Sequence, residues 1–241
     1  MIGLCAPLLM FEDVLDLGFD YLEIKCSEIS KIKPKPKPFY YANSFIPADK
    51  ALFKDEKQYF DSVNYCCDLL SISKSKGIKH ITLGSGIARN IPNSATNRTV
   101  YERWKRFLKT IDYEAYMTGV FIGLEPLVKK ETNFINTFLE AQHWIETLKL
   151  KSFGITFDTY HIYHEMNDLD IIKKTGLSLV SHIHMSNNEK CYPKSLNEVP
   201  SILIEFIKNN FRDLDISIES VPFLLNDITP KIILDLKYLS T

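Results

Sequence analysis

Four side chains that can bind a metal ion stand at the ends of short apolar runs in the second half of the sequence. Glu125 follows Phe-Ile-Gly-Leu, Asp158 follows Gly-Ile-Thr-Phe, and Glu219 follows Ile-Ser-Ile. His184 stands in the pattern His-Ile-His, between Asp158 and Glu219. Three carboxylates and one imidazole suit a divalent ion that accepts oxygen and nitrogen ligands, such as Mn2+, Mg2+, Co2+ or Zn2+. We predict that these four residues, hereafter the mouth cluster, hold one such ion.

The elements that carry the mouth cluster alternate between strand and helix patterns. Eight short apolar runs are typical of strands, and they cover residues 2–6, 21–25, 39–44, 80–84, 120–125, 154–158, 180–185 and 215–219. Between them, apolar residues recur at helical spacing, as they do at Phe60, Val63, Cys67 and Leu70. This alternation in a chain of 241 residues predicts a single-domain (β/α)8 TIM barrel over residues 1–241. An open doubly wound sheet is disfavoured because no GxGxxG pattern follows the first strand.

A barrel of this kind explains how the mouth cluster could meet. The carboxyl ends of all its strands converge on one mouth, and the cluster closes the fifth to eighth predicted strands. A single acid at a strand end is more often a helix N-cap or a surface group. Its recurrence on consecutive strands favours a shared metal ion. His182 lies on the same strand face as His184 and one layer deeper, so we expect it to orient a ligand from behind.

Composition argues against several classes of function. With 29 basic and 30 acidic residues the formal net charge is -1, which disfavours nucleic acid as a partner. No long apolar run is free of charge, so no membrane span is expected, and the start lacks the basic lead of a secretory signal. The five cysteines form no CxxC pair, which indicates free thiols in a reducing cytoplasm. Residues 31–38 alternate Lys with Pro and predict an extended loop.

A set of short motifs resembles one known family. In chain order these are Asn43-Ser44-Phe45-Ile46-Pro47, Gly84-Ser85-Gly86-Ile87-Ala88-Arg89, Glu125-Pro126-Leu127, Glu131-Thr132-Asn133, Asp158-Thr159-Tyr160-His161, His182-Ile183-His184 and Ile216-Ser217-Ile218-Glu219. The ordered set is similar to the xylose-isomerase-like sugar phosphate isomerase/epimerase family, which includes tagatose epimerases and hydroxypyruvate isomerases. The resemblance implies a TIM barrel, one catalytic metal ion on the mouth cluster, and small carbohydrate substrates with an α-hydroxycarbonyl group. It also implies substrate contacts for His161 and Lys190. Further copies of the chain, in a homo-oligomer, are the other partner to consider.

The chemistry expected of such a site is proton transfer next to a carbonyl through an enediolate. Glu125 and Glu219 are the candidates for base and acid, because strand ends on opposite sides of a mouth can reach both faces of a substrate. Return of the proton to the opposite face of the same carbon gives an epimerase. Return to the neighbouring carbon gives an aldose–ketose isomerase.

Other residues expected near the mouth have two interpretations each. Glu23 and Asn43 could hydrogen-bond substrate hydroxyls, and Glu23 could equally be a buried structural acid. Arg89 follows Gly84-Ser85-Gly86 and could bind an anionic group of the substrate or simply pair with a surface acid. His161 could contact substrate or support Asp158.

Three positions depart from the family pattern and keep other functions open. Val128, Asn187 and Lys190 stand where many members have Asn, Asp and Arg, which motivates a non-catalytic barrel as an alternative. A lyase or dehydratase on the same metal site shares the enolate-type intermediate. An AP-endonuclease-like nuclease would need further ligands on earlier strands, whereas His80 opens the fourth strand.

Overall fold

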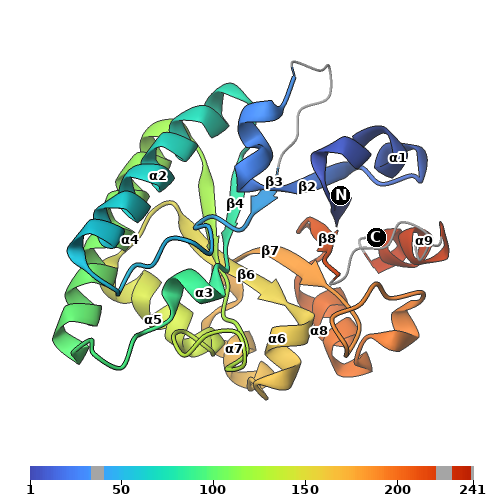
Figure 1. Ribbon diagram of the computed structural model, residues 1–241. Coiled ribbons are helices and arrows are strands. Elements are labelled where there is room, and N and C mark those ends of the chain that lie inside the picture. Colours follow the sequence, from blue (N-terminus) through green and yellow to red (C-terminus); the bar gives the residue numbers. More distant parts are fainter. Residues whose placement is uncertain (34–40, 221–229, 240–241) are drawn as a thin grey trace.

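Eight parallel strands close into a barrel in the computed structural model, which describes residues 1–33, 41–220 and 230–239 (Figure 1). Each strand pairs with the next along the chain, and β8 pairs with β1 to complete the ring. The strands are β1 Ile2–Cys5, β2 Tyr21–Lys25, β3 Tyr41–Asn43, β4 His80–Leu83, β5 Phe121–Leu124, β6 Phe153–Asp158, β7 Val180–Met185 and β8 Ile216–Ile218. The predicted (β/α)8 barrel is therefore confirmed. Most of the predicted Lys-Pro loop, and residues 39–40 of the predicted third strand, lie outside the described residues.

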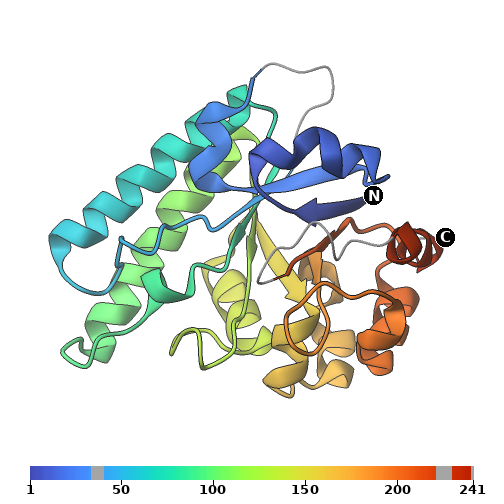
Figure 2. The same ribbon diagram turned by 45° about the vertical axis from the view of Figure 1, so that its right-hand side comes forward.

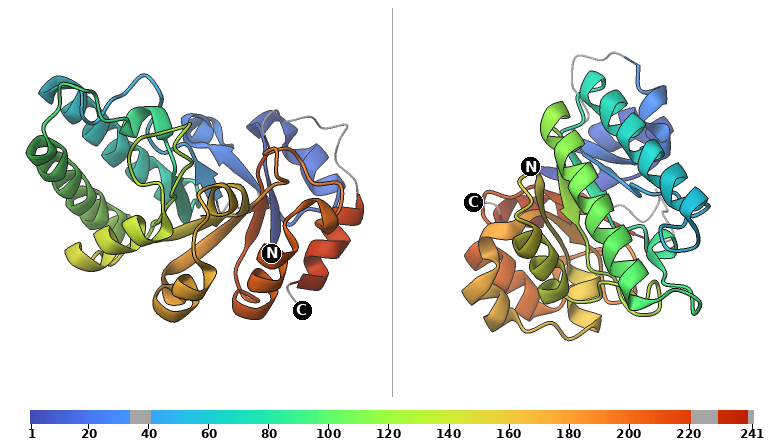
Figure 3. Two further views of the ribbon diagram at one scale, coloured as in Figure 1. Left: turned by 90° about the horizontal axis from the view of Figure 1, so that it is seen from below. Right: turned by 90° about the vertical axis from the view of Figure 1, so that its left-hand side faces the viewer.

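Helices cover the outside of the barrel, and two long ones run side by side along one flank (Figure 1 and Figure 3). This pair is α2 Glu56–Ser75 and α4 Asn97–Thr118. The others are α1 Phe11–Asp16, α3 Gly86–Arg89, α5 Phe138–Leu148, α6 Thr159–His164, α7 Leu169–Thr175, α8 Ser201–Asn210 and α9 Pro230–Leu239, with short 3-10 turns at Leu8–Met10, Cys26–Lys31, Leu177–Leu179 and Leu196–Glu198. Helix α9 packs beside β1 (Figure 2). None of the described helices is both long and apolar enough to cross a bilayer.

Local signals fix where the helices begin, while packing decides which face they bury. Thr137 caps α5 by accepting a hydrogen bond from the Glu140 backbone nitrogen, and the Glu140 carboxylate accepts one from the Thr137 backbone nitrogen. On α2 the predicted helix is confirmed, but one of the four apolar residues that predicted it lies outside the core. Phe60 is 50% exposed, whereas Tyr59 one residue earlier is buried and its hydroxyl accepts a bond from Arg106 on α4. Contact with α4 therefore buries Tyr59 in place of Phe60 at this end of α2.

The strands bury apolar side chains on the helix side and polar ones inside the barrel. On β2, Leu22 and Ile24 are fully buried under the helices, while Tyr21 and Glu23 alternate with them and point inward. A Cβ on Gly123 would overlap the Thr156 hydroxyl, so this glycine keeps the crowded interior open. The barrel interior is a polar column, and its upper end forms the floor of the mouth.

Candidate functional site

The structure brings the mouth cluster together at the carboxyl ends of β5 to β8. One ligand atom from each of its four residues lies within 4.8 Å of the others. His184 Nδ1 is 3.1 Å from Glu125 Oε1 and 3.7 Å from Glu219 Oε2. Glu125, Asp158 and His184 are buried, and the Glu219 side chain is 21% exposed. Residues spread over nearly a hundred positions of sequence therefore converge on one point.

The donor set fits a divalent cation. Asp158 uses Oδ1 to accept a bond of 2.9 Å from the His161 backbone nitrogen at the start of α6. Its other oxygen, Oδ2, is buried and has no hydrogen-bond partner among the described residues. Burial raises the pKa of Asp158, and the nearby Lys190 only partly opposes this. A buried carboxylate oxygen without a donor, beside two glutamates, is an arrangement that a metal ion would satisfy.

Glu23 holds His184 in the orientation that a metal ligand needs. Glu23 Oε1 lies 2.9 Å from His184 Nε2, and Oε2 lies 2.9 Å from His182 Nε2. In the neutral ring that a metal ion would require, the hydrogen on His184 Nε2 donates to Glu23 and the Nδ1 lone pair is directed at the other cluster residues. Burial lowers the pKa of His184, but the carboxylates of Glu23 and Glu219 outweigh it and raise that pKa. His182 bonds to Glu23 and packs edge-on against the His184 ring, and its own ring stacks on Tyr41.

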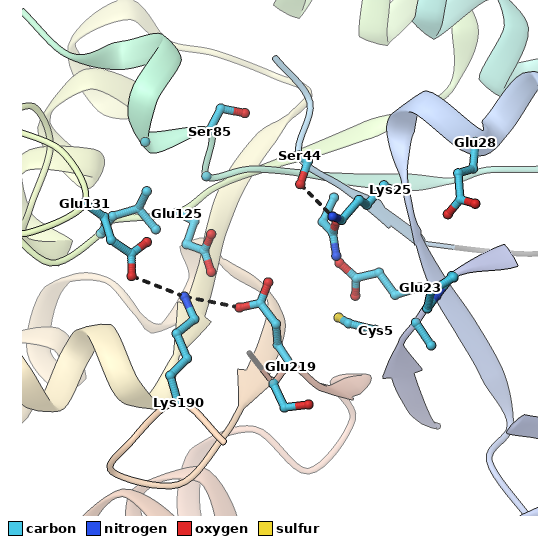
Figure 4. A pocket seen from close by; sticks show the side chains of 17 residues that line it. Cys5, Glu23, Lys25, Glu28, Ser44, Ser85, Glu125, Glu131, Lys190 and Glu219 are labelled. Carbon is cyan, nitrogen blue, oxygen red and sulfur yellow. Dashed lines mark hydrogen bonds and ion pairs between the residues drawn. The ribbon is translucent and has the colours of Figure 1, made fainter. Parts of the chain in front are cut away.

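A cation faces the cluster from the loop after β7. Lys190 Nζ lies 3.5 Å from Glu219 Oε2 and 3.7 Å from Glu131 Oε1. Figure 4 shows the ammonium between these two carboxylates. Burial disfavours the charged ammonium, yet Glu219 and Asp158 outweigh it and raise the pKa of Lys190. Burial raises the pKa of Glu219, but the charges of Lys190 and His184 outweigh this effect and lower the pKa below its usual value. Glu219 therefore remains a carboxylate.

His161 stands between Lys190 and the β5–α5 loop with two contacts that conflict. Its Nδ1 is 3.2 Å from the backbone nitrogen of Val128, and its Nε2 is 2.7 Å from Lys190 Nζ. Burial and the Lys190 charge lower the pKa of His161 to about 4, so the ring is neutral. A neutral imidazole carries one hydrogen and accepts at only one nitrogen, so it cannot accept from both of these donors.

A cavity of about 640 Å3 opens above the cluster. Glu23 and Asn43, both expected near substrate, line it, and so do Glu125, Glu219 and Lys190. Arg89 does not. Its guanidinium is fully buried and donates from Nη2 to the backbone carbonyl of Glu125 at 3.0 Å, and burial lowers its pKa to about 10. The structure thus places Arg89 behind Glu125.

Several residues of the cavity were not assigned to the site from the sequence, and three of them lie against the cluster or its neighbours. Glu131 lies in the loop between β5 and α5, where no periodicity predicts direction. Cys5 follows Gly3 on the inner face of β1, so strict alternation could have found it. Gly84 leaves room for a carboxylate, because a Cβ there would overlap Glu125 Oε2.

Comparison with known proteins decides the family. The sequence profile described as "Xylose isomerase-like TIM barrel" matches residues 11–199. The chain belongs to this family.

The relatives that this chain matches carry epimerase names. The chain is 31% identical over 88 residues to the 3-dehydro-D-guloside 4-epimerase of Escherichia coli, which is 36% of this chain and 34% of that protein. It is 26% identical over 201 residues to the D-psicose 3-epimerase of Enterocloster bolteae, which is 76% of this chain and 66% of that protein. The matches thus span about a third and just under two thirds of these relatives. The crystal structure of a 3-keto-D-glucoside 4-epimerase from E. coli superposes with a TM-score of 0.79 at 18% identity, over 99% of this chain and 98% of that one.

The three positions expected to depart from the family pattern have defined contacts in the structure. Asn187 Oδ1 accepts bonds from the backbone nitrogens of Glu189 and Cys191, so the amide closes the turn as a carboxylate would. This turn holds Lys190 at φ 59, a left-handed conformation that a lysine adopts only when its surroundings enforce it. Val128 presents a backbone nitrogen, not its side chain, to His161.

Proposed function

We propose that this protein is a metal-dependent isomerase or epimerase of a small sugar with an α-hydroxycarbonyl group, acting as a single domain. One observation carries the proposal. Three carboxylates and one imidazole share a point at the floor of the cavity, and Glu125 and Glu219 both line that cavity. The epimerase names of the relatives support the same class of reaction.

The mouth cluster would hold a metal ion, and two of its residues would also move a proton. A divalent ion on the mouth cluster would supply stabilisation of the negative charge that develops on the substrate carbonyl oxygen. Glu219, kept ionised by Lys190, removes a proton from the carbon next to the carbonyl. Glu125, which follows β5 on another side of the mouth, acts as the acid and donates a proton of its own to the substrate carbon. Glu125 and Glu219 line the same cavity from different sides. Each carboxylate can therefore reach a different face of the substrate.

His161 and Lys190 would bind a substrate oxygen between them. Without substrate the neutral ring cannot satisfy both of its contacts. An entering hydroxyl or carbonyl oxygen accepts from the Nε2 hydrogen and from the ammonium, while Nδ1 keeps its bond with Val128. The substrate oxygen would thus remove the conflict between the two donors that face His161, and this relief would favour binding.

Metal binding and solvent exchange test the proposal in two steps. Purified protein titrated with Mn2+, Co2+ or Zn2+ should bind one equivalent and gain thermal stability. The loaded protein in deuterated water should then introduce deuterium at the carbon next to the carbonyl of ketoses or hydroxypyruvate. E219Q should lose this exchange and stay folded. A protein that binds metal but exchanges nothing across the panel would favour the non-catalytic alternative. Loss of a β-hydroxyl from the substrate would identify a dehydratase.

A further inference from the structure

The cavity above the mouth cluster extends well beyond it. At one end stand Glu125, Glu219, Glu131 and Lys190. Figure 4 shows Lys25 and Glu28 on the opposite side, the side on which Glu23 also lies. Lys25 is the last residue of β2, and Glu28 lies in the 3-10 turn that follows it directly. This second end of the cavity is therefore built on the barrel wall.

The volume exceeds what a single sugar ring requires. A hexose has about twelve heavy atoms, and even at a full water volume of about 30 Å3 each it would take up about 360 Å3. The cavity holds about 640 Å3. Its walls leave this space because the described residues that line it include no aromatic side chain and many small ones, namely Cys5, Ala6, Ser44, Ser85, Gly86 and Ser220.

The second end offers hydrogen-bonding groups of both kinds without an excess of charge. Lys25 closes β2 on the same inward face as Glu23, and its ammonium has no hydrogen bond or ion pair with any described residue. Glu28 uses Oε2 to accept from the Leu8 backbone nitrogen at 3.2 Å, which leaves Oε1 available. One donor group, one acceptor group and the Ser44 hydroxyl match sugar hydroxyls, which donate and accept. An anionic group would instead meet Glu28 and the carboxylates of the cavity floor.

We propose that this second end is a subsite for an uncharged, hydroxyl-rich substituent, so that the substrate is a glycosylated sugar and not a free monosaccharide or a sugar phosphate. The inference rests on the proposed function for the position of the reacting ring. The ring with the α-hydroxycarbonyl lies over the mouth cluster, and the glycosidic substituent extends toward Lys25 and Glu28.

Matched ligands test the subsite by binding, separately from turnover. In the presence of Mn2+, calorimetry compares D-fructose, D-fructose 6-phosphate and the glucosyl-fructoses isomaltulose, maltulose and turanose, which attach glucose at different positions. At least one disaccharide should bind ten-fold or more tightly than D-fructose, and the phosphate should not. Equal affinity for all the neutral ligands, or tightest binding of the phosphate, would overturn the subsite.

A variant pair locates the effect. K25F, at an exposed strand end, should reduce the preference for the disaccharide over D-fructose by ten-fold or more. K151F replaces an exposed lysine before β6 at the opposite face of the barrel and should leave the preference unchanged. An unchanged preference in K25F would refute the assignment. Deuterium exchange on the same ligands keeps the outcomes apart, because binding preference without exchange on any sugar would contradict the proposed function and retain the subsite.

Discussion

Replacing Glu23 with glutamine isolates what one buried carboxylate contributes to the mouth cluster. In the native protein its two oxygens each face an imidazole Nε2 at 2.9 Å, from His182 and His184. Glutamine keeps one acceptor oxygen and presents an N–H2 group to the other ring. One buried donor then loses its acceptor, which costs about 1–3 kcal/mol, and the loss of charge beside His184 adds to this.

The consequence for metal binding follows from the orientation of His184. When no acceptor fixes the hydrogen on Nε2, the ring can place it on Nδ1 and withdraw the lone pair from the cluster. Loss of such a supporting partner weakens metal affinity by roughly 10–100-fold. We expect E23Q to bind Mn2+ that much more weakly in calorimetry, and to unfold in urea with a free energy lower by about 2–3 kcal/mol.

The matched control is E28Q, which makes the same chemical change in the same cavity. Glu28 accepts a single bond from a backbone nitrogen and touches no histidine ring, so Mn2+ affinity and stability should stay close to those of the native protein. If E23Q also bound Mn2+ with native affinity, Glu23 would not orient His184. If E23Q lowered the free energy of unfolding but not the Mn2+ affinity, the role of Glu23 would be structural only.

Three further predictions concern the walls of the site. G84A should weaken Mn2+ binding about ten-fold or more, measured by calorimetry, because the new Cβ displaces the Glu125 carboxylate at an overpacking cost of roughly 1–3 kcal/mol. The lowered pKa of His161, about 4 in the folded protein, means that the unfolded chain takes up its proton first as pH falls. Native protein should therefore lose roughly 2 kcal/mol more stability than H161Q between pH 7 and pH 5 in urea unfolding, and equal losses would contradict this. N187A should release the turn that holds Lys190 and lower kcat/KM in the exchange assay, whereas N187D should retain it.

Strand ends made the mouth cluster predictable, because their position depends only on the alternation of short apolar runs and on the geometry of a closed barrel. The same logic placed His182 one layer below His184, where the structure has it. It could not place Arg89. The Gly-Ser-Gly turn leads into α3, and this short helix carries the guanidinium under the Glu125 carbonyl and away from the cavity. Whether a loop residue faces a mouth or its rear wall depends on such local turns, which have no sequence period.

Lys190 and Glu131 show what the loops add to the barrel. Strand ends alone would leave an acidic floor whose carboxylates repel one another, and Lys190 is the cation that balances it from above. Its position requires a left-handed backbone and an asparagine-closed turn, neither of which apolar spacing reveals. The barrel therefore fixes which groups can react, while the loops set their charge and the space left for substrate. On this reasoning the small residues that line the cavity serve the choice of substrate, and not the reaction itself.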